Sequence, residues 1–205
     1  MRTFKETFAK VLFICAACIS ILAVALICVF LFANGVPGMA KIGVWDFLSG
    51  TKWKPGNDIY GILPMILGSI YVTAGALLLG VPAGLMTAIF MSRFAGQRTV
   101  KLMRPAVALL AGIPSVVYGF FGLVVIVPMV RSLFGGSGMS LLSACLLLGM
   151  MILPTIISVS ESALNAVPAN YYEGALALGA THERAVFRVI LPAAKSGVMA
   201  AVRCV

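Results

Sequence analysis

Long apolar segments alternate with short polar ones along this sequence. The apolar segments cover residues 11–33, 62–91, 105–130 and 140–160, and a fifth begins near Val198. Each of the first four reaches or exceeds the ~20 residues that an α-helix needs to cross a bilayer, whereas the fifth does not. The pattern predicts an all-α membrane protein with a bundle of four complete transmembrane helices and a partial fifth.

Basic residues lie mainly in the short polar segments. Arg2, Lys5 and Lys10 precede the first apolar segment, and Arg93, Arg98, Lys101 and Arg104 lie between the second and the third. Cytoplasmic segments carry an excess of lysine and arginine, so the N-terminus and the second basic segment are expected in the cytoplasm. Counting two crossings from a cytoplasmic N-terminus gives the same result. The first apolar segment is longer than the core of a signal peptide, and we expect an uncleaved anchor.

The segment 34–60 is more polar and is expected to be an exterior loop. It is rich in glycine, tryptophan and lysine. Trp45 and Trp53 either lie at the membrane interface, where indole rings are favoured, or pack within the loop. The sequence leaves both alternatives open.

Composition excludes a soluble domain. The chain is 61% hydrophobic and 10% charged, whereas a soluble domain carries about 25% charged residues. The net charge of +9 would suggest a nucleic-acid partner in a soluble protein. Here the basic residues follow the membrane topology instead, so nucleic acid is excluded as a partner.

Cysteines and prolines lie inside the apolar segments. Cys15 and Cys18 form a C-x-x-C, a spacing found in redox and metal sites. They lie in an apolar run with no histidine or carboxylate nearby, so we expect them to pack in a helix, and no metal site is predicted. Pro82, Pro114 and Pro154 fall in the second, third and fourth spans, where each is expected to kink its helix.

Residues 161–192 follow the fourth span and are expected to form a cytoplasmic loop of two short helices. The first helix should cover 169–178, with Gly179 in the left-handed conformation that ends a helix. Thr181 should cap the second helix. That helix is expected to run to Leu191, because Pro192 cannot continue it.

The residues required by an enzyme or a self-powered carrier are missing. No complete span has a charged residue in its middle, whereas ion-coupled carriers need such groups. The chain also lacks a phosphate-cradling GxxxxGK[ST] loop. His182 is expected to be a solvated residue on a helix surface, Glu161 to be solvated at a helix end, and Ser115 has no base beside it. We predict no catalytic site, and any ATP hydrolysis should come from a partner chain.

The loop sequence resembles the EAA loop of the permeases of ABC importers. That motif reads E-A-A, three residues, G, nine residues, then I-x-L-P, and the positions that match it here are Glu173, Gly174, Ala175, Gly179, Val189, Leu191 and Pro192. Gly174 replaces the first alanine and Val189 replaces the isoleucine. The resemblance implies that the loop is a coupling helix docked in a groove of an ATPase subunit. Ala175, Ala177 and Leu178 would then share the docking surface, and Glu173 would make a polar contact that anchors the helix pair.

Three further stretches are similar to permeases of phosphate importers, and more to the PstC type than to the PstA type. They are "YGILPMILGSIYVT", "LLAGIPSVVYGFFGL" and "ALALGAT". The resemblance implies the fold of type I (MetI-like) permeases. Residues 1–61 would form a cytoplasmic tail, the first helix and the exterior loop. Residues 62–205 would form the permease domain, including the coupling loop 161–192 and the three prolines near the pathway.

The resemblance also implies an assembly in a bacterial inner membrane. The expected partners are a PstA-like second permease subunit, two ATPase subunits, an extracytoplasmic phosphate-binding protein and membrane lipid. The chain itself would bind no cofactor, and the sequence does not identify its solute contacts. Alternatives are a permease for another solute, of the sulfate or amino-acid type, or a non-functional truncated fragment. Truncation is expected because permeases of this type continue through complete fifth and sixth spans, with a Gly-Arg-Ala-x-Gly-Glu-like segment that is missing around Arg203.

Overall fold

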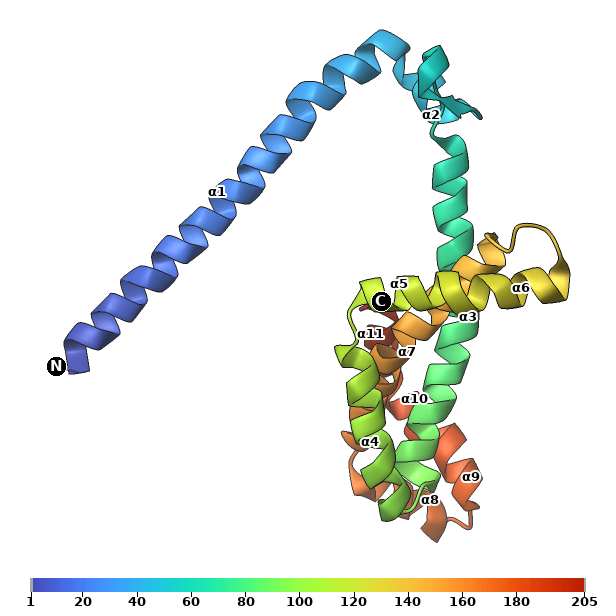
Figure 1. Ribbon diagram of the computed structural model, residues 1–205. Coiled ribbons are helices and arrows are strands. Elements are labelled where there is room, and N and C mark those ends of the chain that lie inside the picture. Colours follow the sequence, from blue (N-terminus) through green and yellow to red (C-terminus); the bar gives the residue numbers. More distant parts are fainter. Residues whose placement is uncertain (1, 205) are drawn as a thin grey trace. The chain divides into compact units, whose positions relative to one another are not determined.

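The computed structural model describes residues 2–204, with side chains from residue 7 onward. The described residues are mainly helical. They form two compact units, one extending up to Leu67 and the other beginning at Gly68 (Figure 1).

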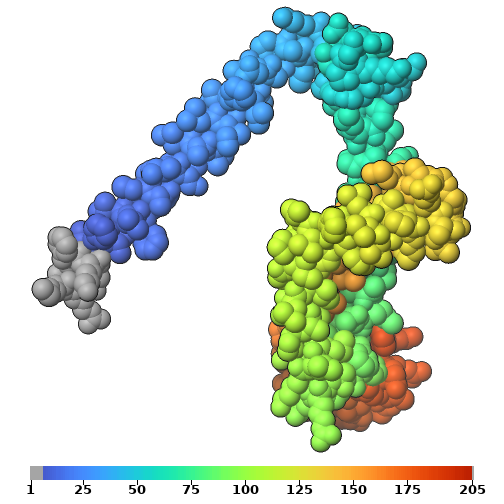
Figure 2. Space-filling model, in the orientation of Figure 1, coloured from blue at the N-terminus to red at the C-terminus, as the bar shows by residue number. Residues whose placement is uncertain are grey.

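A single long helix makes up most of the first unit. Helix α1 covers Arg2–Ile42 and contains Pro37, and no other element of the first unit covers the apolar part of this helix (Figure 2). The prediction of a loop from residue 34 was therefore wrong for residues 34–42. A proline removes one helical hydrogen bond and can bend a helix without ending it, so the local sequence G-V-P-G was a poor guide to the helix end.

A small cap follows α1. It consists of α2 (Val44–Ser49), β1 (Trp53–Lys54), η1 (Pro55–Asn57) and β2 (Ile59–Tyr60). The two strands pair antiparallel, with Trp53 opposite Tyr60, and the two rings meet edge to face with centroids 5.7 Å apart. Trp45 is 82% exposed. Trp53 contacts Tyr60 within the cap but is still 44% exposed, so either indole ring is accessible to an interface.

Helices α3 (Leu63–Ile89) and α7 (Leu141–Asn165) form the centre of the second unit. A π-helical turn, η2 (Phe90–Phe94), extends α3. The two helices approach closely where α3 has glycines: an added Cβ at Gly84 would lie 2.7 Å from Ile156 Cγ2, and one at Gly80 would lie 2.6 Å from Ile152 Cδ1. The small glycine residues of α3 thus allow the close approach of α7.

The third apolar segment is broken, and the prediction of one kinked helix over 105–130 was wrong. Helix α4 (Gln97–Gly112) ends before Ile113 and Pro114, which are extended, and α5 (Ser115–Phe121) begins after them. The residue before a proline is disfavoured in the helical conformation, so Ile113 leaves the helix. The Tyr118 hydroxyl donates to the Leu110 carbonyl at 3.0 Å and bridges the break.

The chain continues from α5 through η3 (Gly122–Ile126), again a π-helical turn, to α6 (Val127–Phe134). After α7 come α8 (Ala169–Ala177), α9 (His182–Ala185), η4 (Val186–Ile190), α10 (Leu191–Ala193) and α11 (Lys195–Arg203). Helices α8 and α9 lie at one end of the α3–α4–α7 bundle (Figure 1).

Four described helical segments are long and apolar enough to cross a membrane, as predicted. They are Thr7–Ile42, Leu63–Phe94, Ser115–Phe134 and Leu141–Asn165. A fifth would be the pair His182–Ala193 and Lys195–Arg203, which is bent by 64°. The predicted number of complete spans is confirmed, while the third span begins ten residues later than expected because of the break at Pro114.

Cys15 and Cys18 lie in a helix, α1, as expected, but among the described cysteines only Cys145 is buried. The Cys145 thiol lies 3.6 Å from the Val72 carbonyl. Cys15 and Cys18 are exposed on α1, because no element of the first unit covers that helix.

The close approach of α3 and α7 can be tested at Gly84. We expect Gly84→Ala to destabilise the protein by about 1–3 kcal/mol, the usual cost of overpacking, because the new methyl group would meet the branched side chain of Ile156. The measurement is thermal unfolding in detergent. Gly68→Ala is the matched control, because no atom lies within 4 Å of its added Cβ. An equal Tm for both variants would contradict the close contact.

Candidate functional site

The turn between α8 and α9 is built from local sequence signals. Pro168 precedes α8, and Gly179 has a φ of +81°. The Gly179 amide donates to the Leu176 carbonyl at 2.9 Å, and the Ala180 amide donates to the Ala175 carbonyl at 3.0 Å. These two bonds form the Schellman motif that closes a helix. The predicted end of the first helix at Gly179 is confirmed.

Thr181 begins the second helix, as predicted. Its hydroxyl oxygen accepts a hydrogen bond from the Arg184 amide at 3.4 Å, which satisfies one of the free amides of the first turn. Glu183 lies in that turn and outside the four spanning helices. The pKa of Glu183 is lowered, first by a hydrogen bond from its own backbone amide and then by one from Thr181. The cap therefore favours a charged carboxylate at the helix start.

Pro192 does not end the second helix, contrary to the prediction. The Leu191 amide donates to the Val186 carbonyl, so the turn η4 is π-helical, and Leu191–Ala193 remains helical. A proline is tolerated in the first turn of a helical segment, where its missing N–H is not needed. Pro192 lies in the helical segment directly after this π-helical turn, and the chain changes direction after Ala193, where His182–Ala193 and Lys195–Arg203 are bent by 64°.

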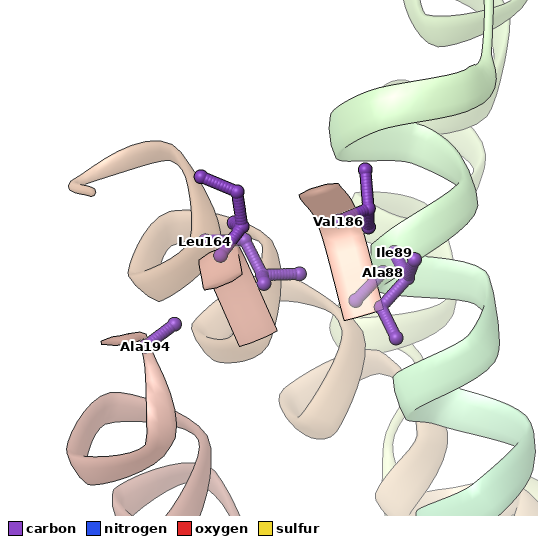
Figure 3. Packing of buried hydrophobic residues seen from close by; sticks show 6 residues of the cluster. Ala88, Ile89, Leu164, Val186 and Ala194 are labelled. Atoms are coloured by element: carbon purple, nitrogen blue, oxygen red, sulfur yellow. The ribbon is translucent and has the colours of Figure 1, made fainter. Parts of the chain in front are cut away.

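The turn η4 anchors the loop to the spanning helices. Val186 and Ile190 are completely buried. They belong to one apolar cluster with Ala88 and Ile89 of α3 and Leu164 of α7 (Figure 3). Fully burying a side chain of this size contributes about 1.5–3 kcal/mol. The second half of the loop is therefore packed into the ends of two spans.

The first half of the loop has the opposite character. Leu178, at the tip between α8 and α9, is 91% exposed, and Tyr171 and Leu176 are also exposed. No residue of α8 is buried. These apolar side chains are accessible to a partner. The loop thus combines a buried anchor with an exposed tip.

The residues matched to the EAA motif divide between these two parts. Glu173, Gly174 and Gly179 are exposed, and Ala175 is half-buried. Val189 and Leu191 are half-buried and Pro192 is exposed, with Leu191 packed against the apolar cluster. The structure gives the Glu173 carboxylate no hydrogen bond to a described residue, so its predicted anchoring contact stays a prediction.

His182 was expected to be solvated, and this prediction was wrong. Its Nδ1 atom lies 2.8 Å from the Tyr172 hydroxyl. Its ring meets the Phe94 ring edge to face, with centroids 4.7 Å apart. One side chain therefore connects α8, α9 and η2 at the end of α3. The tight turn at Gly179 brings Tyr172 and His182, which are ten residues apart in the sequence, into contact. Gly179 was therefore the sequence signal from which this contact could have been predicted.

Glu161 was expected to be solvated at a helix end, and this prediction was also wrong. It lies inside α7, is 8% exposed and accepts two hydrogen bonds on one oxygen, from Arg104 Nη2 at 2.7 Å and Arg104 Nε at 3.0 Å. The pair joins α4 to α7. An isolated carboxylate in an apolar helix needs a charged or hydrogen-bonding partner. The basic segment before the third span was the part of the sequence that could supply this partner.

Two more polar contacts tie η2 to the end of α7. Arg93 Nη2 donates to the Leu164 carbonyl at 2.6 Å. The Ser92 hydroxyl donates to Asn165 Oδ1 at 2.7 Å. A cation at the last turn of a helix satisfies carbonyls that lack a partner in the helix. These bonds lie beside the apolar cluster and strengthen the junction of α3, α7 and the loop.

The three prolines expected near a pathway lie in different surroundings. Pro82 is exposed within α3, and Pro154 is buried within α7. Pro114 is exposed at the break before α5. Helices α3 and α7 continue through their prolines, whereas the third span does not.

Comparison with known proteins identifies the family. The family described as "binding-protein-dependent transport system inner membrane component" matches residues 80–205. The chain belongs to this family. The match includes α7, the loop and its anchor, and it agrees with the predicted all-α, MetI-like fold. These inner membrane components are transport permeases, so the chain is a multi-pass membrane protein of an ABC transporter family.

The individual relatives include a probable ABC transporter permease and permeases of phosphate transport systems. The chain is 39% identical to the probable ABC transporter permease protein YqgH of Bacillus subtilis (strain 168), over 98% of this chain and 67% of the relative. It is 31% identical to the phosphate transport system permease protein PstC of Mesorhizobium japonicum, over 86% of this chain and 60% of the relative. A probable PstC of Methanocaldococcus jannaschii is also 31% identical, over 84% and 62%. The chain thus spans about two thirds or less of these relatives, and no match was found among solved structures.

The link between Tyr172 and His182 gives a testable prediction for this transport permease. Tyr172→Phe removes only the hydroxyl that bonds to His182, and such a bond contributes about 1 kcal/mol. We expect amides of α8 and α9 to exchange with deuterium about fivefold faster, because local opening becomes easier. Tyr171→Phe is the control, since Tyr171 is exposed on the same helix. Equal exchange in both variants would show that the bond does not hold the helices together.

Proposed function

We propose that this chain is a membrane subunit of an ATP-driven importer of inorganic phosphate. The observation that carries the proposal is the two-part loop, with a buried anchor at Val186 and Ile190 and an exposed tip at Leu178. A loop that transmits force needs a partner-binding tip and a rigid connection to the spans. The relatives named PstC support phosphate as the solute.

In this proposal the loop couples the pore to a separate ATPase. ATP binding would close two ATPase subunits and move the docked tips of the two permease subunits. The anchor η4 would pass that movement to α3 and α7, because it is packed against both. A PstA-like second permease subunit and a phosphate-binding protein outside the membrane would complete the assembly. Glu173, Gly174 and Ala175 would lie in the contact with the ATPase.

The orientation follows from charge. Arg93, Arg98, Lys101 and Arg104 lie at the loop side of α3 and α4, and Arg93 and Arg104 contact the same end of α7 that precedes α8. Positive residues favour the cytoplasmic side. The loop and the N-terminus would therefore be cytoplasmic, and the cap after α1 would be exterior.

The exposed tip can be tested by Leu178→Ser. If Leu178 enters an apolar groove of the ATPase, losing its burial costs about 1.5–3 kcal/mol. We expect the affinity of the assembled permease pair for its ATPase to fall about tenfold or more, and phosphate uptake to fall with it. The affinity is measured by titrating the ATPase onto the purified pair.

Leu102→Ser is the matched control for this experiment. Leu102 is 77% exposed on α4, so both variants remove a similar exposed leucine, but only Leu178 lies in the loop. We expect the control to bind the ATPase normally. Equal binding by the Leu178 variant and the unmodified protein would contradict docking at the tip.

The solute is tested by uptake of radioactive phosphate in cells that depend on the complete transporter. Excess unlabelled phosphate should suppress the uptake of label, whereas excess sulfate or amino acids should not. Suppression by sulfate to the same degree would favour a sulfate-type permease. ATPase docking and solute identity are thus tested by separate measurements.

A further inference from the structure

The basic residues of α4 form a stripe with little opposing charge. Arg98, Lys101 and Arg104 are spaced three residues apart, so they lie along one face of the helix, where like charges repel. Glu161 is the one acidic residue between positions 91 and 165, and it pairs with Arg104. Lys101 and Arg98 have no acidic partner among the residues that the structure describes. Anions that balance the charges of this stripe would therefore have to come from outside the chain.

A pocket of about 320 Å³ lies beside this stripe, where η2, α4 and the end of α7 meet. Its lining includes Lys101, Arg104, Ser92 and Asn165 and no acidic residue. Glu161 lines a neighbouring cavity of about 410 Å³ instead. The two cavities adjoin each other and share Met91, Arg104 and Asn165 in their linings.

Several donors of the pocket remain available to a ligand. Arg104 uses Nε and Nη2 toward Glu161, which leaves its Nη1 group without a partner in the described part of the chain. Asn165 Oδ1 accepts from Ser92, and the NH₂ group of the same amide adds two donors. The Lys101 ammonium adds three donors. Cationic and amide donors without an acid are the chemistry that binds phosphate.

We propose that this pocket, the α4 basic pocket, binds the phosphate group of an anionic ligand. An anionic phospholipid headgroup and free inorganic phosphate present the same group. Apolar Met91 and Val100 also line the pocket, and the outer surface of α4 is uncovered, as Figure 2 shows in green. Basic pockets between membrane helices bind lipid headgroups in this way. The proposal does not depend on which solute the protein transports.

The test uses the purified chain in nanodiscs of zwitterionic lipid and the variant Lys101→Gln. Added phosphatidylglycerol or inorganic phosphate is titrated in separate arms, and binding is measured by native mass spectrometry of the bound ligand. We expect Lys101→Gln to weaken binding about fivefold, the effect of one basic residue near a charged lipid surface. Arg98→Gln is the matched control, because Arg98 has the same charge and is also exposed but does not line the pocket.

The outcomes separate the sources of the phosphate group. Binding of phosphatidylglycerol alone, weakened only by Lys101→Gln, identifies a lipid headgroup site. Competition by inorganic phosphate at the same residue identifies a site for the free ion. An equal loss in Lys101→Gln and Arg98→Gln would mean that only the general surface charge attracts anions, and this would overturn the proposal. Absence of binding in both arms would overturn it as well.

Discussion

The burial of the π-helical turn η4 restricts how the loop can move relative to α3 and α7. Val186 and Ile190 are enclosed by Ala88 and Ile89 of α3 and by Leu164 of α7. Because protein interiors are close-packed, a turn enclosed in this way cannot slide freely. The loop and the ends of both spans must then move together. In the proposed function, a partner would bind the exposed tip at Leu178, and the buried turn would transmit its movement to the spans.

Polar contacts fix the geometry of this apolar junction between the loop, α3 and α7. His182 connects the two helices of the loop to Phe94 at the end of α3. Arg93 binds the Leu164 carbonyl, and Arg104 binds Glu161 one turn earlier in α7. Hydrogen bonds depend on angle and distance more strongly than apolar contacts do. They therefore fix one arrangement of helices that the apolar cluster alone would leave less well defined.

Local signals in the sequence predicted the parts of the site that depend on neighbouring residues only. Gly179 ends α8 and Thr181 begins α9 as expected, because left-handed glycines and side-chain caps act within a few residues. The number of spans was also predictable, since bilayer thickness sets the length of an apolar helix. By contrast, Pro192 failed as a helix end, because the helix continues through the π-helical turn before it to Ala193. Partners distant in sequence, such as Arg104 for Glu161, could not be chosen from sequence, because several basic residues were available.

The central claim is that the loop and α3 move as one body. Spin labels at Leu178, on the exposed tip, and at Met86, on an exposed face of α3, would report the distance between the two parts in the assembled transporter. The account predicts that double electron–electron resonance gives the same distance with and without ATP, within about 2 Å, as for a preformed rigid unit. A change of about 5 Å or more, the length of one helical turn, would mean that the loop slides on the spans and would contradict the account.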